Sequence, residues 1–463
     1  MLPARMLYSG YGGTDMKNMT LLRAKKASGG RLCGAFDENT ELGRVVIDSR
    51  LVQPGDLFVA YKGDKVDGHD YIAAAFDKGA ACCLAQRIPE GETRPILLVK
   101  DVQTALEKIA AEYRRDLTIP MIGITGSVGK TSAKEMIASV LEQRFRVLKT
   151  DRNLNNQIGV PMTISRIEPE HEAAVVEMGI SGFGEMRALT KIVHPTVAVF
   201  TVIGHAHLEF LHDRRGVFQA KTEMLEGMDE DGVVIVNGDD DLLCSLECPQ
   251  KKLSFGLGDH CDIRARNIRV DEQGHTSCTI LYEEGSMAVR IPSFGNHMIY
   301  AALEGAAVGL VLGLTEEEIV RGIAAYETVG SRAAVTETGK ITLIDDSYNA
   351  NPDSVKCGVD SLMQLPGRHV CVFGDMLELG SEEKEMHREA GAYAAEKGVE
   401  LLLCAGPLSR EMALGAGERG RWFPDREELL RALPQLIRQG DLVLVKASRG
   451  MHFESIAEAL KTL

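Results

Sequence analysis

The chain has 463 residues and a mass of 50.4 kDa, which is more than one ordinary hydrophobic core holds and predicts several domains. Hydrophobic residues make up 44% and charged residues 26%, a balance typical of globular proteins that excludes an extensively disordered chain. The 52 Lys and Arg residues against 67 Asp and Glu give a net charge of −15 without any basic run, so we expect no nucleic-acid partner.

The apolar pattern predicts neither a membrane span nor a secretory signal. The longest apolar run, residues 301–314, is interrupted by Glu304 and is shorter than the roughly 18 residues that a membrane helix needs. The ten cysteines include no C-x-x-C pair, and several lie in apolar runs, which is typical of reduced, buried thiols. We therefore expect a cytoplasmic protein.

The first part of the chain predicts a leader and a small domain. Residues 1–16 are Gly-rich and aperiodic, as in a flexible leader. Residues 17–115 alternate short apolar runs, such as VVIDSR, DLFVAY and PILLVK, with turns and with one helical stretch at 70–78. This alternation favours a small α/β domain.

Two larger α/β units are predicted to follow. In residues 116–329, strand-like runs (MIGITG, AAVVEM, TVAVFTVIG, GVVIVNG) alternate with helical segments, which predicts a mostly parallel sheet. Residues 261–295 break this rhythm and predict an antiparallel excursion, followed by helices near 298–312 and 315–325. In residues 330–463 the runs ITLIDD, HVCVFGD, VELLLCAG and DLVLVKAS predict a Rossmann-like domain.

A glycine-rich turn lies between the predicted strand MIGITG and the helix after it. GITGSVGKTS, residues 123–132, has glycines at 123, 126 and 129, so it departs from the strict G-x-x-x-x-G-K-[ST] spacing. Glycines let successive N–H groups converge on a phosphate, and the helix N-terminus adds partial positive charge. Lys130 then reaches the terminal phosphates, and Thr131 offers a hydroxyl to Mg²⁺. The segment predicts a nucleoside triphosphate site; the alternative is a plain turn with a surface lysine.

Three further polar residues come after strands of the same predicted sheet. Glu177 ends the run AAVVEM, His207 follows TVAVFTVIG, and Lys221 lies farther along in QAKTEML. Each alone is more often structural or solvated. Their common placement near the edge where open α/β sheets hold ligands favours a metal site.

Six segments together resemble the Mur ligase family of bacterial cell-wall synthesis. They are GITGSVGKTS, TDRNLNNQIGVP, VVEMGISGFGEM, GHAHLE, DDSYNANP and FGDMLELG. The resemblance runs from about residue 31 to the end. It implies an α/β protein of three domains, with a UDP-substrate-binding N-terminal domain, a central P-loop domain on a parallel sheet and a C-terminal Rossmann-like domain.

The resemblance also implies an activity. DSYNANP and GDMLELG are the segments most specific to the member that joins D-Ala-D-Ala to UDP-N-acetylmuramoyl-tripeptide, with ATP and through an acyl phosphate. Two alternatives stay open. One is a ligase of the same fold with another acceptor, such as the third-residue adder, whose D-N-P-R segment is absent, or a folylpolyglutamate-type enzyme. The other is a non-catalytic ATP-binding module.

Residue roles follow from the same resemblance. Catalytic roles fall on Lys130, His207, Lys221 and Arg332. ATP contacts fall on Gly126, Ser127, Val128, Gly129, Lys130, Thr131, Ser132, His297, Asp346 and Tyr348. Mg²⁺ ligands are Thr131, Glu177, His207 and Lys221, the last matching a lysine that is carbamylated in many relatives. Substrate contacts are Ser49 and Arg50 for UDP, Asn155 and Asn156 for the muramoyl-peptide, and Arg449 for the dipeptide.

Two segments depart from the family pattern, one of which has Arg152 where a glycine is common. The family usually carries Asn where FGNHMIYAALEG has Met298 and Ala301. We further expect a monomer whose last domain rotates about residues 329–332 to bring three substrates together.

Overall fold

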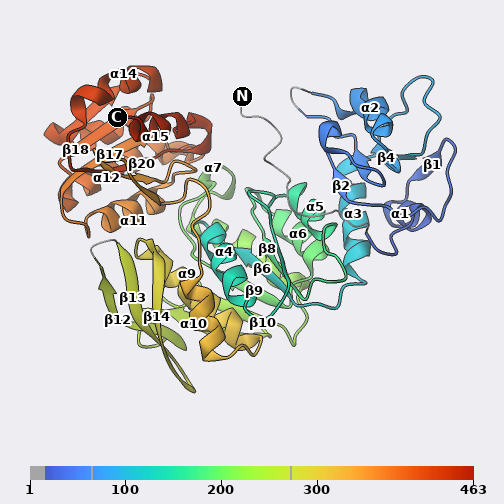
Figure 1. Cartoon of the computed structure of the whole chain (residues 1–463), viewed down its shortest axis with the longest axis horizontal. Helices are drawn as coiled ribbons and strands as arrows, with labels where there is room; N and C mark the ends of the chain where they lie inside the picture. The colour runs from blue at the N-terminus through green and yellow to red at the C-terminus, as the bar shows by residue number, and fades with distance from the viewer. Residues whose placement is uncertain (1–15, 64–65, 272–273) are drawn as a thin grey trace.

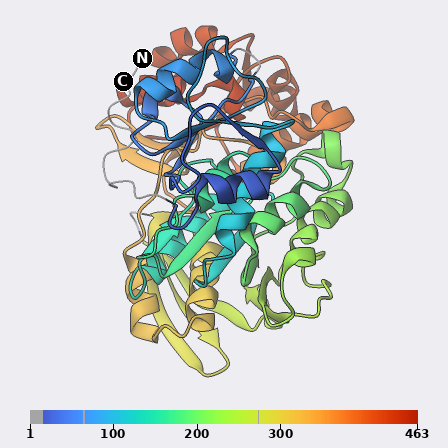
Figure 2. The same ribbon diagram turned by 90° about the vertical axis from the view of Figure 1, so that its right-hand side faces the viewer.

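The computed structural model describes residues 16–463 apart from 64–65 and 272–273. It contains three sheets, and each sheet forms the centre of one domain (Figure 1). The N-terminal and C-terminal domains lie on opposite sides above the central domain. Figure 2 shows both outer domains at the same end of the central one. The predicted leader lies outside the described residues except for Met16, which is buried and donates its N–H to the Leu42 carbonyl.

The N-terminal domain surrounds a five-stranded sheet in the order β1-β5-β4-β3-β2, parallel except where β1 meets β5. The strands are β1 (Arg31–Cys33), β2 (Val45–Val46), β3 (Leu57–Val59), β4 (Cys82–Ala85) and β5 (Ile96–Leu98). The helices are α1 (Leu21–Ser28), α2 (Ile72–Asp77) and α3 (Val102–Arg114), with 3₁₀ turns η2 (Ser49–Leu51) and η3 (Gly68–Tyr71). The predicted stretch 70–78 contains α2, but the prediction of a single helix was wrong, because α1 and α3 also form.

The central domain surrounds a nine-stranded sheet in the order β14-β13-β12-β11-β10-β9-β6-β8-β7. The parallel strands are β6 (Met121–Thr125), β7 (Val147–Lys149), β8 (Ala173–Glu177), β9 (Val197–Phe200), β10 (Val233–Asn237) and β11 (Lys251–Gly256). β12 (Ile263–Val270) continues them, whereas β13 (His275–Tyr282) and β14 (Gly285–Phe294) pair antiparallel, which confirms the predicted excursion.

The helices of the central domain include both of those predicted at its end. They are α4 (Lys130–Leu141), α5 (Gly159–Ile164), α6 (Glu185–Val193), α7 (Leu208–Leu211), α8 (Arg214–Thr222), the 3₁₀ turn η4 (Glu223–Gly227), α9 (His297–Val311) and α10 (Glu316–Ala324). The last two confirm the helices predicted near 298–312 and 315–325.

The C-terminal domain surrounds a six-stranded sheet in the order β15-β16-β20-β17-β18-β19, parallel except where β15 meets β16. Its strands are β15 (Ala334–Glu337), β16 (Thr342–Asp345), β17 (Arg368–Gly374), β18 (Leu401–Ala405), β19 (Gly420–Phe423) and β20 (Asp441–Lys446). Its helices are α11 (Pro352–Leu362), α12 (Glu383–Lys397), α13 (Ser409–Gly415), α14 (Arg426–Leu436) and α15 (Glu454–Lys461), with 3₁₀ turns η5 (Gly380–Glu382), η6 (Gly417–Arg419) and η7 (Arg449–Met451).

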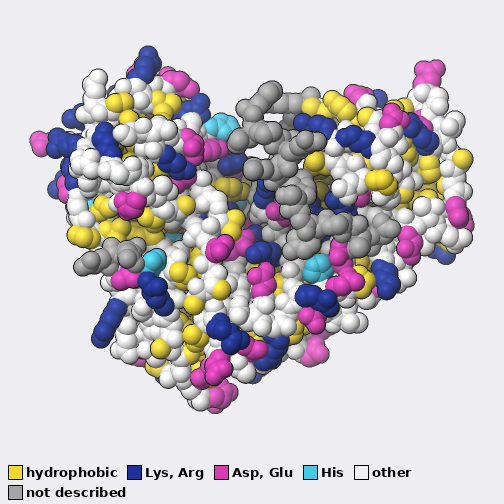
Figure 3. Space-filling view, viewed as in Figure 1, with side chains coloured by type: hydrophobic (Ala, Val, Ile, Leu, Met, Phe, Trp, Pro, Cys, Tyr) yellow, Lys and Arg dark blue, Asp and Glu magenta, His cyan; other side chains and the backbone are white. Residues whose placement is uncertain are grey.

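The surface and the cysteines are those of an ordinary globular chain. All ten cysteines are free thiols, and Cys371 and Cys404 are buried on the paired strands β17 and β18. Lys and Arg side chains are interspersed with Asp and Glu on the face drawn in Figure 3. Of the helices in the described part of the chain, none combines the length and the apolar character that crossing a bilayer requires.

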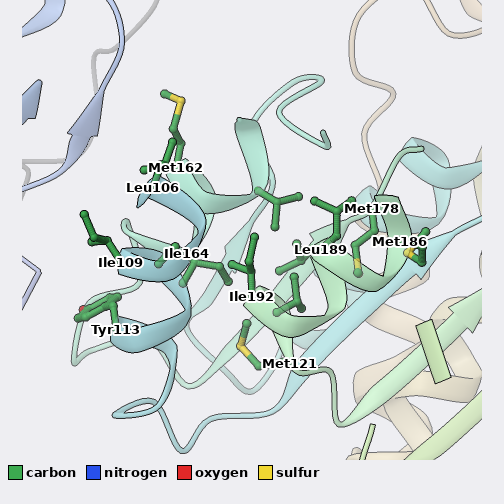
Figure 4. Packing of buried hydrophobic residues seen from close by; sticks show 14 of the residues in the cluster. Leu106, Ile109, Tyr113, Met121, Met162, Ile164, Met178, Met186, Leu189 and Ile192 are labelled. Atoms are coloured by element: carbon green, nitrogen blue, oxygen red, sulfur yellow. The ribbon is translucent and has the colours of Figure 1, made fainter. Parts of the chain in front are cut away.

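One hydrophobic cluster joins the N-terminal and central domains. It runs from Met16 to Leu246 and includes the apolar side chains of α3, whose helix packs on α5 and α6. Figure 4 shows Leu106 and Ile109 of α3 beside Ile164 of α5 and Ile192 of α6. The C-terminal domain has two separate clusters, to which Phe294 is the one central-domain contribution among the described residues. The outer domains are therefore attached to the central one in different ways.

Candidate active site

The glycine-rich turn joins β6 to α4 in a conformation that needs glycine. Gly126 has a φ of +154°, and a Cβ built on it comes 1.9 Å from the hydroxyl of Thr201. Gly129 has a φ of +86° and is the N-cap of α4. The backbone N–H groups of the first helical turn, which begins directly after it, have no carbonyl partner within the helix. Val128 lies between the two glycines and its carbonyl accepts a hydrogen bond from the Thr201 hydroxyl at 2.5 Å. This geometry fits a phosphate.

Lys130, Thr131 and Ser132 form the first turn of α4, directly after the glycines. The Lys130 Nζ donates to the Gly126 carbonyl at 2.8 Å, so the side chain folds back over the loop. Burial and the charge of Arg332 lower the pKa of Lys130, while Glu177 raises it. An ammonium with a lowered pKa gains most from the approach of an anion. Ser127 closes the loop by hydrogen bonds with both backbone groups of Gly204.

Glu177 ends β8 beside this turn and is only 1% exposed. Its carboxylate accepts hydrogen bonds from the Thr131 hydroxyl at 2.8 Å and from the Asn155 amide at 2.7 Å. Its own N–H donates to the Thr150 hydroxyl at 3.0 Å. Among the residues that the structure describes, no Lys or Arg forms an ion pair with it. The charge of Lys130 is close enough to interact with Glu177, but a buried carboxylate without a direct ion pair is costly, and a bound cation would compensate it.

Lys221 lies in the last turn of α8 and is 1% exposed. Burial, together with the charge of Lys130, lowers the pKa of Lys221 well below its ordinary value. No ion pair or hydrogen bond of its ammonium is seen within the described ranges. Its amine form is therefore more favoured than that of an exposed lysine.

His207 caps α7 with a φ of +55° and faces the C-terminal domain. Its Nδ1 lies 2.6 Å from a carboxylate oxygen of Glu378. Burial is the main cause that lowers the pKa of His207, and the charges of Lys221 and Lys130 add to it, whereas Glu378 raises it. His207, Lys221 and Lys130 are therefore close enough for their charges to affect one another.

Four predicted residues meet where α9 and the C-terminal domain face each other. The guanidinium of Arg332 lies 4.2 Å from the ring centre of Tyr348. The Nζ of Lys446 donates to Asp346 at 2.5 Å. His297 begins α9, and its pKa, which burial lowers, responds to the charges of both Asp346 and Lys446. The residues predicted to hold the nucleotide thus lie on both sides of the contact between two domains.

Other predicted residues lie outside this group. Arg50 is bound to the Asp48 carboxylate, and within the described structure its hydrogen bonds stay inside the N-terminal domain, next to the buried Ser49. Asn156 accepts from the N–H groups of residues 158 and 159, which starts α5. Arg449 lies 5.0 Å from the Tyr348 ring centre and pairs with a carboxylate of α15.

Met298 and Ala301, which depart from the family pattern, are core positions. Met298 and Ala301 are 1% and 3% exposed and belong to the cluster between α9 and the sheet. Their side chains therefore contribute to packing. Asn296 and His297, which directly precede Met298, lie at the partly exposed start of the helix.

Sequence reasoning missed the carboxylates that the C-terminal domain contributes. Asp353 accepts from the backbone N–H of His205 at 2.6 Å and lies 3.2 Å from its ring Nδ1, and Glu378 contacts His207. Glu378 lies in GDMLELG and Asp353 directly follows DSYNANP, so the carboxylates in and beside these two segments were the signal that could have found them.

A second group of metal-ligating types lies elsewhere. Asp239, His260 and Cys261 come close together beyond β10. Both carboxylate oxygens of Asp239 already accept hydrogen bonds, from two backbone N–H groups and from the Tyr300 hydroxyl. The cluster therefore closes a turn and is no part of this site.

Three sequence models of known domains match in chain order. The Mur ligase family catalytic domain matches residues 41–114, the Mur ligase middle domain 124–309, and the Mur ligase glutamate ligase domain 331–449. The chain belongs to the Mur ligase family. The predicted family, its α/β fold class and its standing as an ATP-dependent ligase are confirmed.

Individual Mur ligases match over nearly the whole length. The UDP-N-acetylmuramoyl-tripeptide–D-alanyl-D-alanine ligase of Bacillus subtilis is 36% identical over 441 residues, covering 93% of this chain and 96% of that one. The Escherichia coli protein of the same name is 36% identical over 96% of this chain and 99% of its own. The crystal structure of MurF from Acinetobacter baumannii superposes with a TM-score of 0.90 at 32% identity, covering 96% and 99%. MurF from Thermotoga maritima in complex with ADP gives 0.81 at 29%, covering 90% and 97%.

Proposed function

We propose that this ligase joins D-alanyl-D-alanine to UDP-N-acetylmuramoyl-tripeptide and converts ATP to ADP and phosphate. The similarity over nearly the whole chain to ligases named for that reaction is the observation that carries the proposal. The phosphate loop with Lys130 supports the use of ATP, and a relative was crystallised with ADP. In this proposal residues 17–115 bind the UDP end, 116–329 bind ATP and 330–463 bind the dipeptide.

The donors around Glu177 fit a magnesium ion. A buried carboxylate and the Thr131 hydroxyl supply the oxygen ligands that Mg²⁺ prefers, and His207 adds a nitrogen. When bound, Mg²⁺ neutralises part of the charge that develops as two anions approach each other. In this structure Thr131 and Asn155 occupy the oxygens of Glu177, and both are groups that can turn to a ligand instead.

Carbamylation of Lys221 would remove an unfavourable charge from this site. A second ammonium beside Lys130 repels a divalent cation, whereas the neutral amine is a nucleophile. Its nitrogen forms a bond with the carbon of CO₂ and one N–H proton leaves to solvent, which gives an anionic carbamate. NMR with isotope-labelled bicarbonate should show a carbamate carbon in the wild-type protein and none in Lys221→Arg; equal spectra would exclude the modification.

The reaction proposed has two steps. A carboxylate oxygen of the tripeptide forms a bond with the γ-phosphorus, the bond to the bridging oxygen breaks, and ADP leaves. The amine of D-Ala-D-Ala then bonds to the carbonyl carbon of the acyl phosphate, gives up a proton, and phosphate leaves. Lys130 and Arg332 offset the negative charge around the phosphates, the electrostatic task on which this chemistry depends most. In this proposal Asn155, whose amide donates to Glu177, meets the peptide end of the substrate.

One assay tests the reaction and its acceptor. ADP release is measured with Mg²⁺-ATP and UDP-N-acetylmuramoyl-tripeptide, with and without D-Ala-D-Ala, and with single amino acids as control acceptors. We expect release that depends on the dipeptide. Release with a single amino acid alone would assign the chain to another ligase of the family, and no release with any acceptor would favour a binding module.

A further inference from the structure

The loop before α7 faces the C-terminal domain with two histidines in alternate positions. His205 is held by Asp353, in the first turn of α11, through its backbone N–H at 2.6 Å and its ring. His207 is held by Glu378, which follows β17, at 2.6 Å. In the same region α7 contacts η5, and Figure 1 shows α7 beside the C-terminal domain. Two histidine–carboxylate pairs therefore cross one domain boundary.

The contact with Glu378 decides which nitrogen of His207 is free. An ionised carboxylate only accepts hydrogen bonds, so the Nδ1 of His207 must carry the proton that it donates to Glu378. In the neutral ring the lone pair then lies on Nε2. Metal-binding histidines commonly donate their other N–H to a carboxylate, which fixes both the tautomer and the ring orientation.

We propose that Glu378 is a positioning residue, which reaches across from the C-terminal domain and fixes His207 in the tautomer that leaves Nε2 for the cation site. This inference rests on the proposed function, in which His207 is a magnesium ligand. Glu378 itself contacts neither the cation nor the substrates. It acts only through the ring of His207.

Domain position is thereby coupled to the cation site. Glu378 belongs to the C-terminal domain, and the chain passes from the central domain to that domain once, near residues 329–332. When the domains lie as they do here, the ring is held between its backbone and Glu378. When they separate, the ring is free to turn and to exchange its proton between nitrogens. The ring of His207 is therefore fixed only while the C-terminal domain keeps Glu378 within reach of it.

A pair of variants tests the inference with a matched control. Glu378→Gln replaces the carboxylate that holds His207, and Asp353→Asn makes the same change at the pair that holds His205, on the same boundary. The two carboxylate side chains are 50% and 36% exposed, so both variants should fold. His207→Gln identifies the His207 signals in NMR of the imidazole nitrogens, recorded without metal.

The first readout is the tautomer and the second is cation affinity. In Glu378→Gln we expect the fixed Nδ1–H signal of His207 to be lost. We also expect Mn²⁺, bound together with a non-hydrolysable ATP analogue and followed by electron paramagnetic resonance, to bind about 10- to 100-fold more weakly. Asp353→Asn should leave the His207 tautomer and the Mn²⁺ affinity unchanged.

Three results would overturn the inference. They are wild-type spectra and Mn²⁺ affinity in Glu378→Gln, an equal loss of affinity in Asp353→Asn, which would reduce the role of Glu378 to domain docking, and a wild-type His207 protonated on Nε2. Failure of the proposed function is seen separately, as wild-type protein that releases no ADP in response to the dipeptide.

Discussion

Lys130 combines two properties at the start of α4, a position beside converging backbone N–H groups and a charge that its surroundings destabilise. Its hydrogen bond to Gly126 is made within the loop, so the ammonium is already held where a phosphate would lie. Burial and Arg332 lower its pKa, which means that anion binding relieves an existing electrostatic cost. The residue is thus suited to binding and to charge stabilisation together.

Lys130→Ala should abolish ligation without unfolding the protein. Loss of one preorganised donor at developing negative charge costs about 100- to 1,000-fold in kcat, and loss of ATP binding adds to it. ADP release in the presence of the dipeptide measures the effect, and circular dichroism of the variant checks the fold. Near-normal turnover would remove the assignment of residues 123–132 as the phosphate loop.

At the residue scale the sequence predicted which polar residues follow the strands of the central sheet, but not every partner of these residues. Lys130, Glu177 and His207 lie where the pattern placed them, because a polar residue after a buried strand reaches the carboxyl edge of a parallel sheet. Glu378 and Asp353 escaped, since their partners lie more than 140 positions away in another domain. Spacing along a chain carries no information on such a contact.

At the scale of elements, α9 shows how a buried helix tolerates one ionisable group. The helix is buried on nearly all sides, and Glu304 at its middle is 3% exposed among apolar neighbours from α4 and the sheet. Burial raises the pKa of Glu304 well above the ordinary carboxyl value. Glu304 is also the residue that interrupts the longest apolar run of the sequence, residues 301–314, which is one reason why no membrane helix is predicted there.

Glu304→Gln should stabilise the protein, and more so at high pH. The folded chain keeps the Glu304 proton above the ordinary carboxyl pKa while the unfolded chain releases it, so the free energy of unfolding falls as pH rises. Gln cannot ionise and removes this slope, with an expected gain of about 1–3 kcal/mol at pH 8 and almost none near pH 4. Thermal unfolding at both pH values measures it. A gain that is equal at both pH values would show that the carboxyl is not the source.

Helices and strands differ in how well the sequence predicts them. Helix α3 was open to prediction, because its buried residues recur three and four apart and Asp101 caps it. The edge strands β15 and β19 were not predicted, because they are short and half-exposed and lack the apolar runs of the central strands. Their pairing with β16 and β18 defines them more than their own residues do.

At the scale of the whole molecule, the two outer domains differ in how they are fixed. The N-terminal domain shares a hydrophobic cluster with the central domain through α3, which couples the two rigidly. The C-terminal domain has its own hydrophobic clusters and meets the central domain through the polar pairs of His205 and His207 and through a few apolar contacts, among them Phe294 and Met386. Small polar interfaces permit relative motion, whereas large apolar ones oppose it.

The connection at residues 329–332 is the segment about which we expect the C-terminal domain to rotate. Gly330 has a φ of +67° with open space where a side chain would lie, and Val329 is 48% exposed, whereas Ser331 and Arg332 contact Tyr348. Backbone rotations there move the C-terminal domain as a body and carry Arg332, Asp346 and Glu378 with it. Because the N-terminal domain shares a hydrophobic cluster with the central one, we expect closure over the substrates to come from this side.

We therefore expect the C-terminal domain to rotate when all substrates bind. Small-angle scattering of the wild-type protein with an ATP analogue, UDP-N-acetylmuramoyl-tripeptide and D-Ala-D-Ala should differ from that of the free protein in radius of gyration and in distance distribution. Lys130→Ala, which lacks the phosphate contact, should keep the scattering of the free state under the same conditions. An unchanged curve in the wild-type protein would show that the arrangement seen here already brings the three domains into working contact, and the open segment around Gly330 would then serve only to connect them.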